Sequence, residues 1–146
     1  MSQTVWSHET ELSPDPRSAA NARTFVSDRL TYHHLPDLID DVRLAASELA
    51  TNAVLHAQQS FTVNLRGDER LVVLTVRDGS RLAPVQCVTQ LLDTHGRGLA
   101  IVASISHDWG IDRSSGAAKS VWASFEVMPA CDTASTGQSP NLKAAR

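Results

Sequence analysis

The sequence contains few cysteines and few aromatic residues, and it lacks any long apolar run. Its two cysteines, Cys87 and Cys131, form no CxxC pair, so a disulfide framework and a cysteine-based metal site are disfavoured. Free thiols in a cytoplasmic protein are the simplest interpretation. The apolar stretches are far too short to span a bilayer, and residues 1–4 have neither the cationic nor the apolar part of a signal peptide. We therefore expect no membrane-spanning segment and no signal peptide.

A surplus of positive charge, which nucleic-acid binding requires, is also missing. The chain has 13 Lys and Arg against 16 Asp and Glu, a net charge of −3, so a direct nucleic-acid partner is disfavoured. The tryptophans Trp6, Trp109 and Trp122 are not interleaved with basic residues, and we interpret them as packing residues. With 146 residues, 42% of them hydrophobic, the chain is long enough for one globular domain with a core.

The spacing of apolar residues predicts an α+β domain over residues 4–127. Apolar residues at helical spacing alternate along the chain with segments in which every second residue is apolar. The predicted strands are 4–12, 61–66, 71–76, 107–112 and 119–127, and the predicted helices are 16–32, 36–57 and one that follows Gly98. Asp15 is the expected N-cap of the first helix, and Gly67-Asp68 is the expected turn of a hairpin. Residues 128–146 are small and polar and are expected to form a flexible tail.

Three polar residues follow one another along the second predicted helix. Glu48, Asn52 and His56 are spaced at i, i+4 and i+8, so they form a row on one side of it. The row borders an apolar stripe that should face the core, made of Val42, Ala46, Leu49, Ala53 and Ala57. Polar groups at the edge of a buried face lose hydration unless something binds them. A solvated helix flank is the simpler alternative for such a row.

Two further segments have the composition of binding loops. Asp78-Gly79 ends the strongly β-prone strand, where binding carboxylates are often found, although Asp-Gly is also a common turn. Gly96-Arg97-Gly98-Leu99 leads directly into an apolar helix, so its backbone N–H groups are suited to phosphate oxygens. These glycines are also consistent with a simple tight turn. The sequence lacks GxxxxGK[ST], which excludes a Walker-type phosphate loop.

His33 and His34 are adjacent and suggest metal binding. Side chains at neighbouring helical positions point apart, so a solvated turn is the more economical interpretation. Pro36 follows them and marks the start of the next helix.

Taken together, the three polar segments resemble the ATP-binding domain of the GHKL superfamily. Residues 48–57 resemble its N box, residues 76–80 its first glycine box and residues 96–102 its second. The resemblance covers residues 4–127. It implies the Bergerat fold, a two-layer α/β sandwich with a mixed, mostly antiparallel sheet and about three helices on one face. The small size and the form of the N box resemble one branch, the bacterial anti-sigma factors that are also serine/threonine kinases.

This resemblance implies a role for each motif residue. Glu48 would be the catalytic base, Asn52 would bind Mg²⁺ and ATP, and Asp78 would accept a hydrogen bond from the exocyclic amine of adenine. Residues 81–95 would be the ATP lid. The remaining residues expected to line the ATP site are His56, Gly79, Gly96, Arg97, Gly98, Leu99 and Ser120, the last of these near the adenine.

The first glycine box departs from the family pattern Asp-x-Gly-x-Gly. Here it is Asp78-Gly79-Ser80-Arg81-Leu82, so ATP binding is a firmer implication than phosphoryl transfer. The implied partners are a STAS-type anti-sigma factor antagonist, as phosphorylation substrate, and a sigma factor. A binding module that acts by nucleotide occupancy and a split histidine kinase remain as alternatives. Leu44 and Leu55 lie away from the core stripe and permit a homodimer.

Overall fold

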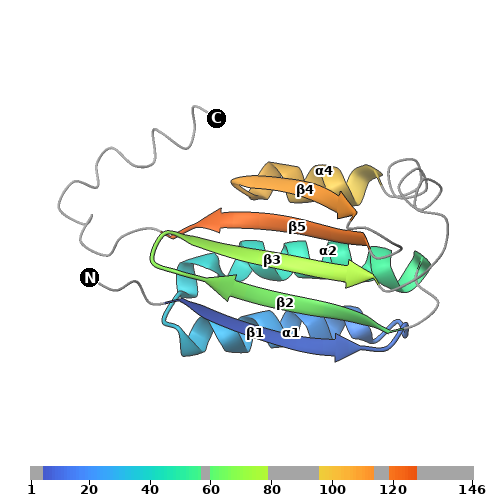
Figure 1. The fold of residues 1–146 in the computed structure, drawn as a ribbon, viewed down its shortest axis with the longest axis horizontal. Coiled ribbons are helices and arrows are strands. Elements are labelled where there is room, and N and C mark those ends of the chain that lie inside the picture. Colours follow the sequence, from blue (N-terminus) through green and yellow to red (C-terminus); the bar gives the residue numbers. More distant parts are fainter. Residues whose placement is uncertain (1–4, 57–59, 79–95, 114–118, 128–146) are drawn as a thin grey trace.

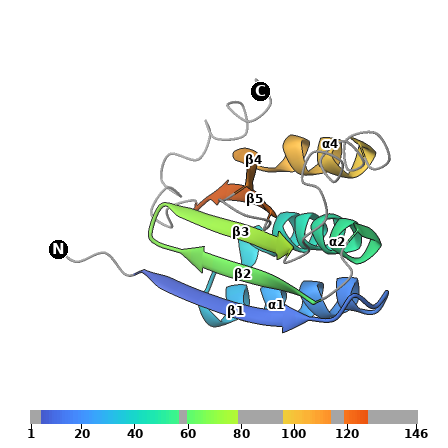
Figure 2. The same ribbon diagram turned by 45° about the vertical axis from the view of Figure 1, so that its right-hand side comes forward.

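The computed structural model describes residues 5–56, 60–78, 96–113 and 119–127. These residues form a five-stranded sheet in the order β1-β2-β3-β5-β4 with helices packed on one face (Figures 1 and 2). All four strand pairings are antiparallel. The strands are β1 (Trp6–Leu12), β2 (Phe61–Gly67), β3 (Leu71–Asp78), β4 (Asp108–Arg113) and β5 (Lys119–Glu126). The helices are α1 (Ser18–Tyr32), the short 3₁₀ turn η1 (Pro36–Leu38), α2 (Ile39–His56) and α4 (Gly96–Ile105).

The predicted hairpin forms as β2 and β3. The carboxylate of Asp68 fixes its turn, since one oxygen accepts hydrogen bonds from the backbone N–H groups of Arg70 at 2.7 Å and Leu71 at 2.9 Å. Along β3 every second residue is buried from Val72 to Asp78. This alternation is the period of a strand with one covered face, and it decides which residues point to the helices.

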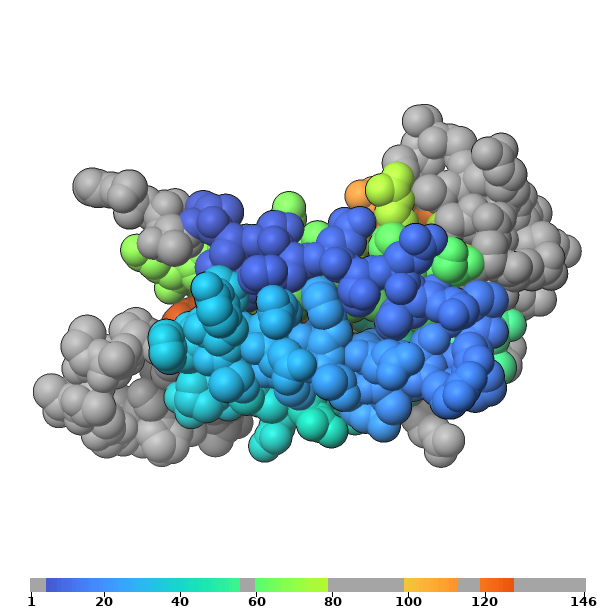
Figure 3. Space-filling view, turned by 90° about the horizontal axis from the view of Figure 1, so that it is seen from below, coloured from blue at the N-terminus to red at the C-terminus, as the bar shows by residue number. Residues whose placement is uncertain are grey.

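The core lies between the sheet and the helices. Figure 3 shows the two layers edge-on, with β1 in dark blue above α1 in lighter blue. Helix α1 contributes Ala22, Val26 and Leu30, all fully buried. The largest fully buried side chains on the sheet are Phe61, Leu65 and Leu74. The predicted α+β, two-layer architecture is confirmed.

The start of α1 differs from the expectation that Asp15 caps it. The helix begins at Ser18, and Arg17 occupies the N-cap position without a side-chain cap. Asp15 instead accepts a hydrogen bond from the backbone N–H of Arg17 at 2.8 Å and pairs with the guanidinium of the same residue. Such a local bond, two residues along the chain, forms a turn that precedes the helix.

His33 and His34 form the predicted turn after α1, and His34 is exposed, but the ring of His33 is also part of an aromatic cluster. Its ring stacks on Trp6 with a centroid distance of 3.9 Å and an interplanar angle of 11°. Its Nε2 lies 2.8 Å from the Nε2 of His8 on β1. Among the described residues, no group of three or more His, Cys, Asp or Glu is placed to hold a metal ion. Within the same residues, no helix combines the length and the apolarity needed to cross a membrane.

Candidate nucleotide site

Helix α2 carries the polar row of the sequence, and its apolar stripe faces the core as expected. Val42, Ala46, Leu49 and Ala53 are buried. Within the row, Glu48 is half-buried, while Asn52 is only 6% exposed. The row is therefore not uniformly at the border of the buried face, since Asn52 is buried and Glu48 is only half-buried. The side chain of His56 lies outside the described residues.

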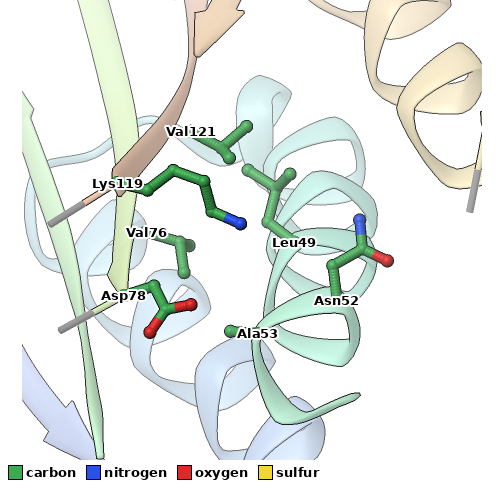
Figure 4. A pocket seen from close by; sticks show the side chains of 7 residues that line it. All are labelled: Leu49, Asn52, Ala53, Val76, Asp78, Lys119 and Val121. Atoms are coloured by element: carbon green, nitrogen blue, oxygen red, sulfur yellow. The ribbon is translucent and has the colours of Figure 1, made fainter. Parts of the chain in front are cut away.

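Asp78 brings a carboxylate to the inner face of the sheet. It ends β3 in the same phase as the buried Val72, Leu74 and Val76, so it points to the helices, and it is 5% exposed. It lines a pocket between β3, β5 and α2, shown in Figure 4. The residues that line this pocket are Leu49, Asn52, Ala53, Val76, Asp78, Lys119 and Val121. The structure thus brings together two of the predicted site residues, Asn52 and Asp78.

Lys119 occupies the place where we expected Ser120. It pairs directly with Asp78 across β3 and β5, and it is 6% exposed. Ser120 lies on the opposite face of β5 and lines a different hollow, together with Thr75 and Trp122. This corrects the expected position of Ser120. The sequence could have indicated this. Alternate residues of a strand point to the same face, so Lys119 lies on the covered face with Val121, and Ser120 lies on the other face.

Asn52 has a buried polar group without a hydrogen-bond partner in the part of the chain that the structure describes. Within the described residues, its Nδ2 atom makes no hydrogen bond, and such a group destabilises a folded protein by ~1–3 kcal/mol. Figure 4 shows its amide on the side of α2 turned away from Asp78, toward α4. An orphaned buried amide with Glu48 one turn away on the same helix fits an external ligand. The oxygen donors of these two residues are of the type that Mg²⁺ prefers.

The pocket described by these residues is small. Its volume is about 20 Å³, roughly the room of a single water molecule, whereas ligand sites usually measure ~300–1,000 Å³. A nucleotide site would therefore have to extend beyond these described walls. Gly79 and the expected lid, residues 81–95, lie outside the described residues.

The second glycine segment opens a helix as the sequence predicted. Helix α4 begins at Gly96, and Leu99 is 3% exposed, which anchors the first turn in the core. A helix N-terminus of this kind presents unpaired backbone N–H groups at the positive end of the helix dipole. The side chain of Arg97 lies outside the described residues. The geometry thus offers a carboxylate, an amide and a helix N-terminus around α2.

This combination agrees with a comparison of the whole chain with known families. Residues 12–125 match the family described as histidine kinase-like ATPase domain. No curated protein sequence matches the chain. The match extends from the end of β1 to the end of β5 and includes all the described site residues. The chain therefore belongs to the histidine kinase-like ATPase domain family.

Proposed function

We propose that this domain is an ATP-binding regulator of the anti-sigma factor type, which phosphorylates a serine or threonine of a STAS-type antagonist. Membership of the ATPase family implies ATP binding. One observation carries the finer proposal: half-buried Glu48 precedes the orphaned amide of Asn52 by one helical turn. A carboxylate in this position can serve as a general base beside a phosphate-binding amide.

The chemical step needs few groups from this chain. The hydroxyl oxygen of the target serine or threonine attacks the γ-phosphorus of ATP, and its proton passes to the Glu48 carboxylate. The bond between the γ-phosphorus and the bridging oxygen breaks, and its electron pair remains with ADP. Catalysis of this kind consists of positioning and charge stabilisation. Asp78 positions the adenine ring of ATP, and the N–H groups at the start of α4 hold the phosphates.

Mg²⁺ fits the donor set on α2. The amide oxygen of Asn52 would hold the ion, which when bound neutralises charge on the phosphates. Because the amide is buried and its Nδ2 lacks a partner among the described residues, a nucleotide that covers it would also offer a hydrogen-bond acceptor to that atom.

The proposed protein partners are the antagonist and a sigma factor. Two large apolar side chains on α2, Leu44 at 40% and Leu55 at 57% exposure, are eleven residues apart and therefore lie on one side of the helix. They are available to a second copy of the chain, and a homodimer is part of the proposal.

Incubation with labelled ATP, Mg²⁺ and a cognate antagonist tests the proposal. We expect label on a serine or threonine of the antagonist, which Glu48→Gln abolishes while ATP binding is retained. The matched control is Glu11→Gln, a carboxylate on the exposed side of β1 that pairs with Ser60, and it should transfer phosphate normally. A wild-type protein that binds no adenine nucleotide would contradict the proposal.

The same experiment separates two other functions. Tight ATP binding without transfer to any partner supports a binding module that acts by nucleotide occupancy, and the altered glycine box at Ser80 and Leu82 favours this candidate. An acid-labile phosphohistidine on a partner protein supports the catalytic part of a split histidine kinase.

A further inference from the structure

Lys119 is a buried cation in the pocket that the proposed function assigns to adenine. Lysine side chains are almost never fully buried unless they are paired, yet this one is 6% exposed. It lies among apolar side chains that include Leu49, Val76 and Val121. Removing an ammonium group from water in such surroundings is costly, so its retention at this point requires an explanation.

Its neighbour Asp78 supplies the first part of that explanation. The two residues are direct partners in the β3–β5 register, and neither charged group is without a partner. Figure 4 shows that both polar ends reach into the same space, beside Leu49 and Ala53 of α2. The inner end of the pocket therefore presents an acceptor and a donor side by side, in surroundings that exclude most water.

This pair of groups matches one purine better than the other. An ionised carboxylate only accepts hydrogen bonds, and an ammonium group only donates them. Adenine offers the N6 amine as donor next to a ring nitrogen as acceptor, whereas guanine offers two acceptors, O6 and N7, at the same edge. Asp78 and Lys119 together complement adenine, and the Asp78 carboxylate would face O6 of a guanine unfavourably.

We propose that Lys119 is a base-recognising residue, whose ammonium group donates a hydrogen bond to a ring nitrogen of adenine beside the amine bound by Asp78. This inference rests on ATP binding at the proposed site. It assigns adenine recognition to two residues on adjacent strands rather than to Asp78 alone. It also explains why Lys119 stands in phase with Val121 and Ala123 on the covered face of β5.

The test combines a variant with nucleotide analogues in direct binding measurements. The probes are ATP, 1-deaza-ATP and 7-deaza-ATP, which lack one or the other ring nitrogen next to the amine. We expect wild-type protein to bind one of the two analogues roughly tenfold or more weakly than ATP, as for loss of a hydrogen bond to a charged group. Lys119→Met should bind ATP more weakly and should no longer distinguish that analogue from ATP.

The matched control is a variant of Arg77, a positively charged residue that precedes Asp78 in β3 and lies on the opposite face of the sheet. Arg77 is exposed and pairs with Ser120, so Arg77→Met should keep the wild-type preference for ATP over the analogue. Circular dichroism establishes that the variants are folded. If Lys119→Met does not fold, Lys119→Gln serves in the same comparison.

Two outcomes overturn the inference. One is wild-type protein that binds both analogues as tightly as ATP, and the other is a Lys119 variant that retains the full preference for ATP. In both cases ATP still binds, which distinguishes them from failure of the proposed function, where wild-type protein binds no adenine nucleotide.

Discussion

The amide of Asn52 and the carboxylate of Asp78 line the same pocket but point to different sides of helix α2 (Figure 4). Asp78 reaches the helix from the sheet, and Asn52 turns toward α4. A ligand that contacts both must therefore pass across one turn of α2. A nucleotide has the required extension, with a base at one end and phosphates at the other.

Replacement of Asn52 by leucine should stabilise the ligand-free protein while it removes Mg²⁺-dependent nucleotide binding. The buried Nδ2 atom lacks a partner among the described residues, so an apolar side chain of similar shape relieves a desolvation cost of ~1 kcal/mol or more. Thermal unfolding without and with ATP and Mg²⁺ measures both effects.

Asn64→Leu is the control for this change. The Asn64 side chain donates to Ser7 Oγ at 3.2 Å on the exposed face of the sheet, so its replacement should bring no gain in melting temperature. A lower melting temperature for ligand-free Asn52→Leu than for wild type would be at odds with our account of that residue.

Leu49 holds the pocket wall and the core together. It is 2% exposed, and Leu49→Ala should lower the free energy of unfolding by ~2–5 kcal/mol, since it removes buried methyl groups and leaves a cavity. Leu55→Ala changes a side chain that is 57% exposed in the single chain. At protein concentrations low enough to keep the chain monomeric, it should change the free energy of unfolding by at most about 0.5 kcal/mol. Urea denaturation of both variants checks the difference, and equal losses would mean that the two positions are buried alike.

A methyl group at Gly67 should disturb the stack of Trp6 on His33. An added Cβ would lie 2.6 Å from the nearest ring atom of Trp6, so the indole must shift and change its stacking on His33. We expect Gly67→Ala to cost ~1–3 kcal/mol, as for overpacking, measured by chemical denaturation and by tryptophan fluorescence.

Gly110→Ala provides the comparison. Its added Cβ would lie 2.8 Å from the ring of Trp122, but that ring is only partly buried and lies on the face of the sheet opposite the helices. The loss of stability should be smaller than for Gly67→Ala, and the reverse order would show that the stack contributes little.

Acidification should destabilise the fold through His33. Burial, followed by the nearby charges of His8, Arg29 and His34, lowers the pKa of His33 from its ordinary value of 6.5. Between the lowered pKa of His33 in the fold and its ordinary value of 6.5 in the unfolded chain, the unfolded chain binds more protons than the folded one. The contribution of His33 to the free energy of unfolding is therefore fully present above pH 6.5 and is lost as the pH falls toward the lowered pKa.

The variant His33→Phe isolates this effect. The phenyl ring can stack on Trp6 but does not titrate, so the melting temperature of this variant should depend less on pH in the same window. His34→Asn is the control, because asparagine tolerates the φ of 62° at this position and the change removes only the smallest of the charge effects on the pKa of His33. His33→Phe with a wild-type pH dependence would mean that other groups are responsible.

Most of the fold could be predicted because the spacing of apolar residues switches between the helical and the strand pattern at the boundaries of the observed helices and strands. The hairpin is an example: Phe61, Val63 and Leu65 alternate with polar residues, and Asp68 has the acceptor that its turn requires. The first residue of α1 was harder to predict from the sequence. Asp15 can cap a helix or stabilise a turn, and in both cases it accepts a hydrogen bond from a nearby backbone N–H group.

The site was only partly predictable, for two physical reasons. Asp78 and Asn52 could be found because motifs on separate elements resemble one family. The alternation along β5 already places Lys119 on the covered face beside Val121, but its pairing with Asp78 depends on the β3–β5 register, which the sequence does not state. The contact of Trp6 with His33 depends on how the start of β1 meets the end of α1, and no local pattern contains that information.

The position of β5 has a consequence for the newly synthesised chain. This strand is the last one among the described residues. It lies inside the sheet, between β3 and β4, and carries Lys119 and Val121, which line the pocket. Domains tend to fold from the N-terminus as they leave the ribosome. Until residue 126 emerges, β3 is an open edge to which strands of other chains can pair, and β4 has no strand to join. The pocket between β3, β5 and α2 is thus complete only after β5 has joined the sheet, so it forms late in folding.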